Sequence, residues 1–316
     1  MDNTTPEKSN LEYKLIDTLL SEHRSTRRWK NARFFVWVIL FILSIVILID
    51  PFSDTQQNGT SSSSKSYVSL VRLNGTISAE DSFSAEKVVP ELNRAFRDKG
   101  AKGVVLVINS PGGSPVQASI IHDKILQLKK KYNKEVIVVA QDALASGSYL
   151  VATAADKIFV NKDTVTGSIG VIMEGFGFSD VMAKVGVTRR VFTAGANKDR
   201  LDPFMALKPE DQAKIKTILD TVHQDFINDV TEGRKGKLNG DPKELFSGDF
   251  WTGTQAVQLG LADGTANLWE ATEGTFGTTH YRDYSPRPGL WESVVRDMST
   301  QLHLRFENHA KLQAVL

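Results

Sequence analysis

Three short segments of the sequence carry residue types that nucleophilic catalysis uses. The first is Asn109-Ser-Pro-Gly-Gly113, which lies between an apolar run and a helical pattern. Adjacent glycines at such a turn allow backbone N–H groups to point at an oxyanion or a phosphate. A plain strand-to-helix turn would use the same residues, because glycine adopts positive φ at low cost. The segment matches neither the Walker A loop nor the Gly-x-Gly-x-x-Gly fingerprint.

Ser146 is the candidate nucleophile of the second segment, Ala145-Ser-Gly147. It directly follows an apolar strand pattern, and sites in open α/β sheets collect at the carboxyl ends of strands. The alternative interpretation is a serine that caps the following helix. Taken alone, the position does not decide between a nucleophile and a cap.

The third segment, Ala194-Gly-Ala-Asn-Lys198, offers a base for that hydroxyl. A serine nucleophile needs a base within hydrogen-bond reach. No histidine lies between His122 and His223, so the spacing does not favour a Ser-His-Asp triad. Lys198 is the other choice, although a lysine becomes a base only when burial or a neighbouring group lowers its pKa from about 10.4. Otherwise a lysine in a loop is a solvated charge.

These segments are positioned by a pattern that alternates strand and helix signals after residue 67. Such alternation predicts an α/β fold with largely parallel strands. Helices are predicted at 118–128, where apolar residues recur at helical spacing, at 209–232 and from residue 288, where the pattern is amphipathic. Strands are predicted at 68–73, 103–108, 136–139, 158–160, 168–172 and 188–192.

The N-terminal part predicts a single transmembrane helix over residues 33–50. Residues 34–49 contain no charged residue, and their one polar residue is Ser44. A buried core helix and a cleaved signal peptide are the alternatives, but the run has no polar face and no small-residue cleavage site follows it. Lysine and arginine are concentrated before the run, which predicts that residues 1–32 are cytoplasmic and that the chain after Asp50 lies outside. Residues 51–66 are typical of a flexible tether.

Composition excludes several classes of function. Lysine plus arginine total 38 and aspartate plus glutamate 37, a balance that does not favour a nucleic-acid partner. The absence of cysteine excludes disulfides, cysteine-ligated metal sites and thiol catalysis.

In their order and spacing, these motifs resemble the signal peptide peptidase A family of protease IV-type serine–lysine peptidases. The resemblance covers residues 67–270, the predicted peptidase domain, and leaves 271–316 as an amphipathic tail. The motifs that carry it are Asn109-Ser-Pro-Gly-Gly113, Ala145-Ser-Gly147, Ala154-Ala-Asp-Lys-Ile158, Thr166-Gly-Ser-Ile-Gly-Val171, Ala194-Gly-Ala-Asn-Lys198 and Trp251-Thr-Gly253 with Leu259-Gly-Leu-Ala-Asp263.

The resemblance implies a Clp-protease/crotonase-like spiral core of ββα units and assigns roles to particular residues. Ser146 would be the nucleophile, Lys198 the general base, and Ser168 the residue that orients the lysine amine. The oxyanion hole would use backbone N–H groups from Gly112, Gly113 and Gly147. No cofactor and no metal are implied. The family often has Gly-Gly-Tyr-Tyr after the nucleophile, where this chain has Gly147-Ser-Tyr-Leu150.

It also implies a cellular setting. Short members assemble into ring-shaped homo-oligomers on the inner (plasma) membrane, with the catalytic domain on the extracytoplasmic (periplasmic) side. Their substrates would be signal peptide remnants and other apolar peptides. Two alternatives stay open: a catalytically inactive peptide-binding scaffold on the same fold, which would need neither the serine nor the lysine, and a crotonase-type enzyme acting on an acyl-CoA, which would leave Lys198 and the anchor unexplained.

Overall fold

The computed structural model describes residues 33–41 and 66–286, in a chain that divides into two units, 1–64 and 65–316. In the first unit, residues 33–41 form an exposed helix. Among the described residues, no helix combines the length and the apolar character needed to cross a membrane. The rest of the predicted anchor at 33–50, the segment 1–32, nearly all of the tether 51–66 and the helix from residue 288 lie outside the described residues and stay predictions.

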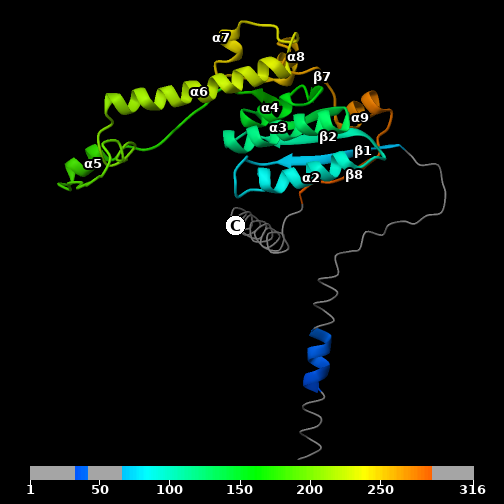
Figure 1. Cartoon of the computed structure of the whole chain (residues 1–316), viewed down its shortest axis with the longest axis horizontal. Helices are drawn as coiled ribbons and strands as arrows, with labels where there is room; N and C mark the ends of the chain where they lie inside the picture. The colour runs from blue at the N-terminus through cyan, green and yellow to red at the C-terminus, as the bar shows by residue number, and fades with distance from the viewer. Residues whose placement is uncertain (1–32, 42–65, 287–316) are drawn as a thin grey trace, which may run out of the picture. The chain divides into compact units, whose positions relative to one another are not determined.

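The second unit has a mixed α/β fold on an eight-stranded sheet (Figure 1). Its elements in chain order are β1 (Tyr67–Asn74), α2 (Ala85–Arg97), β2 (Ala101–Ser110), α3 (Pro115–Tyr132), β3 (Val136–Ala145), α4 (Gly147–Thr153), β4 (Lys157–Val160), β5 (Val165–Gly167), α5 (Ser179–Lys184), α6 (Pro209–Gly233), α7 (Pro242–Leu245), β6 (Phe250–Thr252), α8 (Gly253–Gln258), β7 (Gly264–Thr265), α9 (Leu268–Phe276) and β8 (Tyr281–Asp283).

Most strand pairs of this sheet are parallel, which confirms the α/β class. The order is β6-β5-β3-β2-β1-β8, and β4 joins β3 to β7 off this path. The long strand β3 pairs with β4 along its first half and with β5 along its last three residues. Parallel neighbours need crossover connections, and α2, α3 and α4 provide them between successive strands. The carboxyl ends of β2, β3 and β5 therefore meet at one edge of the sheet.

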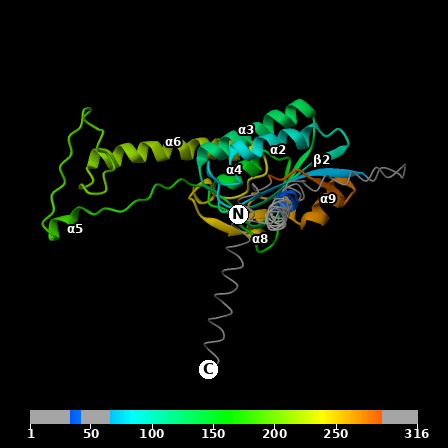
Figure 2. The same ribbon diagram turned by 90° about the horizontal axis from the view of Figure 1, so that it is seen from below.

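Both faces of the central strands are buried, which explains their continuous apolar runs. Along β2, Val104, Leu106 and Ile108 face the core under α2, α3 and α4. The alternate residues Val105 and Val107 face a smaller core closed by α9. Figure 2 shows α2, α3 and α4 together on one side of the sheet.

Two of the predicted strands are absent, and the reasons are local. At 168–172 the chain turns instead, because Gly167 and Ser168 both have positive φ (94° and 49°). At 188–192 the segment is exposed and no strand in the described chain pairs with it. Apolar β-branched residues form a strand only where a neighbouring strand and a packing surface exist.

The sheet also extends beyond the domain boundary expected at residue 270. That position lies inside α9, whose start is fixed by a capping box between Asn267 and Glu270. The short strand β8 then pairs in parallel with β1 and forms an edge of the sheet. Residues 271–283 therefore belong to the same fold as the central strands.

Residues 171–208, here called the arm, extend away from the sheet with α5 at the far end (Figures 1 and 2). The arm leaves the body after the turn at Ser168 and returns through Pro209 at the first position of α6. Many of its large apolar side chains are exposed, including Phe192 at 95% and Phe176 at 83%. The arm therefore lacks the buried core that stabilises the body.

Candidate active site

Ser146 occupies a sharp turn between β3 and α4. Its φ and ψ are 54° and −127°, which non-glycine residues rarely adopt. Its backbone N–H donates to Gly167 O at 2.8 Å, and its side chain makes no capping hydrogen bond to α4. The hydroxyl is therefore not used as a helix cap, the alternative that the sequence left open. A strained backbone held in this way marks a candidate functional position.

The Gly112–Gly113 turn packs directly against this serine. A Cβ atom on Gly112 would lie 2.7 Å from Ser146 Cβ, and one on Gly113 would lie 2.2 Å from Ile77 O. Both glycines have positive φ, at 100° and 146°. Ile77 holds the turn from the other side, because its N–H donates to Gly112 O and its carbonyl accepts from Ser114 N, both at 2.8 Å. Only glycine fits these two positions without displacing backbone.

The hydrogen bonds of this turn show which of the three N–H groups that the resemblance implies for the oxyanion hole already have an acceptor. The N–H of Gly112 donates to Ser110 Oγ at 3.1 Å and is therefore occupied. The N–H groups of Gly113 and Gly147 have no acceptor in the part of the chain that the structure describes. Gly147 begins α4, so its N–H is one of the free donors at the start of a helix. The available pair is thus Gly113 and Gly147.

Ser146 opens into a cleft of about 750 Å³. Apolar side chains dominate its walls, and α6 contributes two carboxylates. One of them, Asp229, has a raised pKa, mainly because burial disfavours its charged form. The charge of the nearby His122 opposes this rise, whereas the negative charges of Asp123 and Asp225 add to it. The lining residues are Pro111, Gly113, Pro115, Val116, Ser119, Ile120, Ser146, Gly147, Leu150, Ser168, Gly170, Val171, Ile172, Val222, Asp225, Phe226, Asp229, Ser247 and Gly248.

Ser168 lies in the same cleft, immediately after β5. Its backbone N–H donates to Asp249 O at 2.7 Å, which fixes its positive φ. The next residue, Ile169, is buried, and its carbonyl oxygen lies 3.0 Å from His223 Nε2 on α6. The structure therefore brings Ser146, Ser168 and the glycine turn together at one cleft.

Lys198 is not brought to this cleft within one chain. It is exposed on the arm, in a turn where its backbone N–H donates to Gly195 O at 3.1 Å. Its side chain has no carboxylate partner among the described residues. None of the three described histidines, at positions 122, 223 and 280, lines the cleft either. Among the described residues, a single copy thus presents the nucleophile and the free N–H pair, and neither a lysine nor a histidine lines the cleft with them.

Sequence reasoning missed the residues that hold this arrangement. Ser148 is fully buried, and its Oγ lies 2.8 Å from the carbonyl oxygens of both Ser110 and Ala145, so it ties the ends of β2 and β3 together. Asn109 adds a second link, because its Oδ1 accepts from Ala143 N at 3.1 Å. The signal in the sequence that could have indicated these residues was a polar residue among apolar residues or glycines. Position 148 is where this chain has a serine and the family often has a glycine, and the serine adds a buried hydroxyl there.

The helix behind the nucleophile is anchored to the closing segment. Tyr149 is fully buried, and its hydroxyl donates to Leu261 O at 2.8 Å. Burial raises the pKa of Tyr149 far above its ordinary value, so the hydroxyl stays protonated and able to donate. Nearby, the buried Arg234 bonds to Gly260 O at 2.8 and 2.9 Å and to Asp263 at 2.6 Å. The segment around residue 260 thus holds α4 in place through the Tyr149 hydrogen bond.

Known proteins with related sequences share this core. The model of peptidase family S49 matches residues 128–275, a range that contains Ser146, Ser168 and Lys198. A Brucella melitensis protein named as the Na(+)/H(+) antiporter NhaA is 43% identical over 215 residues, which cover 66% of this chain and 29% of that protein. A putative signal peptide peptidase SppA of Enterococcus faecium is 33% identical over 58% of this chain and 53% of its own length.

The match to a putative protease of Synechocystis is the fullest of the three described here. The two chains are 32% identical over 215 residues, which cover 66% of this chain and 75% of the relative. The chain spans less than a third of the Brucella protein and about half of the Enterococcus one. Because the identity extends over three quarters of the Synechocystis protease and the family model covers the nucleophile region, the chain belongs to peptidase family S49, the signal peptide peptidase A family.

Proposed function

We propose that the chain is a serine endopeptidase that uses Ser146 as nucleophile and Lys198 as general base. The observation that carries this proposal is the turn at Ser146. A hydroxyl free of capping bonds stands at a strained strand-to-helix junction, beside the unoccupied N–H groups of Gly113 and Gly147. Two such donors stabilise the oxyanion that forms when a peptide carbonyl is attacked. Neither a scaffold nor a simple peptide-binding protein needs that combination.

The proposed reaction is acyl transfer. Ser146 Oγ attacks the peptide carbonyl carbon while its proton passes to the neutral Lys198 amine. The C–N bond of the tetrahedral adduct then breaks, and Lys198 returns the proton to the leaving amine. Water then attacks the carbonyl carbon of the resulting ester and gives a proton to Lys198. The bond between this carbon and Ser146 Oγ breaks, Lys198 returns the proton to Oγ, and the acyl product leaves as a carboxylic acid. Ser168, which lines the same cleft, orients the lysine amine.

We infer that the lysine reaches the serine of a neighbouring copy. Lys198 is exposed on an arm that extends away from its own body, and no lysine of the part of the chain that the structure describes lines the cleft of its own copy. The exposed apolar side chains of the arm, such as Phe176 and Phe192, favour burial against another protein surface. A ring-shaped homo-oligomer of Clp-protease/crotonase-like subunits satisfies both requirements, because each arm then enters the next cleft.

The walls of the cleft support an apolar peptide as the substrate. Val116, Ile120 and Phe226 give the cleft an apolar lining, which suits an apolar peptide that excludes water from the reacting groups. Signal peptide remnants have this character. Together with the predicted anchor at 33–50, this supports an enzyme of the inner membrane, its catalytic domain on the extracytoplasmic side.

The experiment that tests the proposal is complementation between two inactive variants. In detergent, Ser146→Ala and Lys198→Ala are each expected to abolish cleavage of a fluorogenic apolar peptide. When the two are co-assembled at equal amounts, half of the clefts keep the serine and half of those face an intact lysine. About a quarter of the wild-type activity then returns in a ring of shared sites. No recovery in mixed rings would overturn the inference that the lysine comes from a neighbour, and wild-type cleavage by Ser146→Ala alone would overturn the proposed peptidase.

A further inference from the structure

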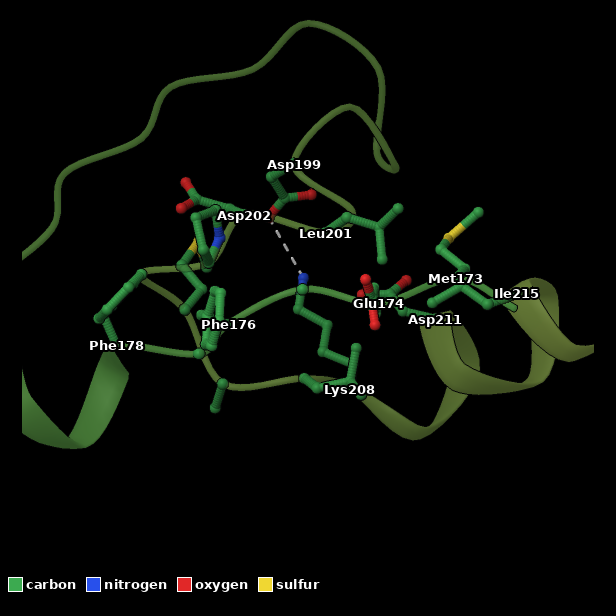
Figure 3. Close-up of a pocket in the computed structure, with 16 residues that line it drawn as sticks. Met173, Glu174, Phe176, Phe178, Asp199, Leu201, Asp202, Lys208, Asp211 and Ile215 are labelled. Atoms are coloured by element: carbon green, nitrogen blue, oxygen red, sulfur yellow. Dashed lines mark hydrogen bonds and ion pairs between the residues drawn. The ribbon is translucent and has the colours of Figure 1, made fainter. Parts of the chain in front are cut away.

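The turn that carries Lys198 is fastened to the start of α6 by two ion pairs. Arg200 Nε lies 2.5 Å from Asp211 Oδ1, and Lys208 Nζ lies 3.3 Å from Asp199 Oδ2. Figure 3 shows the second pair, with Asp199 facing Lys208 in a pocket of the arm that Phe176 and Leu201 also line. The two residues that follow Lys198 in sequence are therefore both tied to the segment where α6 begins.

Asp211 is the buried member of this arrangement. Its side chain is only 8% exposed, although it lies in the first turn of a helix otherwise poor in buried residues. A buried carboxylate is unfavourable unless a charged partner and hydrogen bonds compensate its lost hydration. Arg200 supplies that partner, and the positive end of the α6 dipole favours the negative charge as well. The Arg200–Asp211 pair is therefore a fixed connection and not a fluctuating surface contact.

The rest of the arm makes this connection important for the position of Lys198. A lysine side chain carries its amine on a flexible stem of four carbons, so the amine is placed accurately only if the backbone that bears it is fixed. Many apolar side chains of the arm are exposed, and its aromatic packing centres on Phe178 and Phe204, whose rings stack at 5.6 Å, and not on the turn of Lys198. On the N-terminal side the turn is held by the bond from Lys198 N to Gly195 O. On the C-terminal side it is held by Asp199 and Arg200.

We propose that Arg200 and Asp211 are positioning residues for the general base: their ion pair fixes the turn so that Lys198 enters the cleft at the distance that proton transfer from Ser146 needs. This inference rests on the proposed function. The Asp199–Lys208 pair also helps to fix the turn. It holds the carboxylate of Asp199, the residue after Lys198, on the Lys208 amine instead of the Lys198 amine. Neither pair touches the reacting atoms.

The test measures kcat and KM of the full chain in detergent, with a fluorogenic apolar peptide. Asp211→Asn and Arg200→Met are each expected to lower kcat by roughly 10- to 100-fold with KM changed by no more than about twofold, because small misplacements of a catalytic group cost about that much. Arg200→Lys keeps the charge and is expected to recover most of kcat. The double variant should be no worse than either single one, because both remove the same pair.

Asp220→Asn is the matched control. It removes an ion pair of the same kind on the same helix, because Lys216 Nζ lies 2.9 Å from Asp220 Oδ1, but both side chains are exposed and belong to α6 alone. Its kcat should equal that of the wild type. Thermal unfolding and size-exclusion chromatography of every variant separate misplacement of the base from loss of the fold or of the assembly. Should Asp211→Asn fail to fold, the kcat values of Arg200→Met and Arg200→Lys test the positioning role instead: a low kcat that only the lysine variant recovers supports it, and equal kcat values contradict it.

Two failures are distinguishable. Wild-type kcat in both Asp211→Asn and Arg200→Met, with Lys198→Ala inactive, would overturn the positioning role and leave the peptidase proposal standing. Cleavage at the wild-type rate by Lys198→Ala would remove the base itself, and the proposed mechanism with it.

Discussion

The two halves of the proposed dyad lie in regions of opposite physical character. Ser146 stands at the edge of a parallel sheet whose strands are buried on both faces, and the glycine turn beside it has no room for a Cβ atom. Lys198 stands on an arm whose large apolar side chains are mostly exposed, in a turn that ion pairs tie to the start of α6. Buried packing stabilises the body, whereas the arm relies on ion pairs and on a few aromatic contacts, such as the stacked rings of Phe178 and Phe204.

This difference indicates how a shared site could be built. An oxyanion hole works only if its N–H donors are already in place when charge develops, so those donors belong on rigid backbone. A group supplied to a neighbour must instead extend beyond its own fold, where it cannot be buried by its own core. Substitutions in the body should therefore act within one copy, and substitutions in the arm should act through assembly.

The largest expected effect is that of Gly113→Ala in the body. The new Cβ would clash with Ile77 O, and the N–H at position 113 would be displaced from Ser146. We expect kcat/KM to fall by roughly 100- to 1,000-fold, the range for loss of one oxyanion donor. The control is Gly186→Ala in the arm, which has positive φ but nothing within 4 Å of the added atom. Equal losses in the two variants would contradict the contrast between the regions.

Next in size is the effect of Phe176→Ser combined with Phe192→Ser in the arm. Both phenylalanines are exposed in one copy, so the free energy of unfolding of the isolated copy should change by no more than about 0.5 kcal/mol. Contact between copies should weaken by roughly 10- to 100-fold, because buried aromatic residues dominate interfaces. Light scattering coupled to chromatography, with peptide cleavage on the same fractions, measures this. An unchanged assembly would show that the arm does not contact a neighbour.

Tyr149→Phe tests the support behind the nucleophile. It removes one hydroxyl from a fully buried site and leaves Leu261 O without its donor. The free energy of unfolding should fall by about 1 to 2 kcal/mol, and the assembly should not change. Urea denaturation measures the loss. A loss of assembly without a loss of stability would place α4 in the interface instead of the core.

The smallest expected effect is a difference in acid response between two aspartates. Partial burial raises the pKa of Asp263, but hydrogen bonds from Arg234, Lys237 and the backbone of Ile158 outweigh it, so the pKa lies below its ordinary value. In the arm, the backbone N–H of Phe204 lowers the pKa of Asp202, and Arg189 adds to this.

A carboxylate whose pKa is lowered by folding stabilises the protein above its unfolded pKa, near 3.9, and loses this contribution as the pH falls through the folded pKa. Stability of the wild type should therefore fall more steeply below about pH 4 than that of Asp263→Asn. Asp202→Asn should follow the wild-type curve, because we expect the arm, whose large apolar side chains are mostly exposed, to open before the body unfolds. Denaturant unfolding between pH 6 and pH 2.5 compares the three proteins.

Local sequence patterns were sufficient for the central strands of the body and for α3. The apolar residues at 118, 121, 125 and 128 are all buried on α3, and the predicted strands before Asn109 and Ser146 are present as β2 and β3. Patterns failed at 168–172 and 188–192, where apolar β-branched residues turn or lie exposed. The β6, α8 and β8 segments were not predicted at all, because they are short and depend on partners distant in the chain.

By itself, the sequence determined the α/β class, the family, and the motifs that contain Ser146, Ser168 and the glycine turn, because buried strands, glycine turns and motif spacing are local or ordered along the chain. Only the tertiary structure decided that Gly112 N–H is occupied while Gly113 N–H is free, since that depends on which side chain closes the turn. Only the tertiary structure, too, placed Lys198 on an exposed arm away from its own cleft. Spacing along a chain limits how far two residues can be apart, but the packing of the segments between them decides where each one lies.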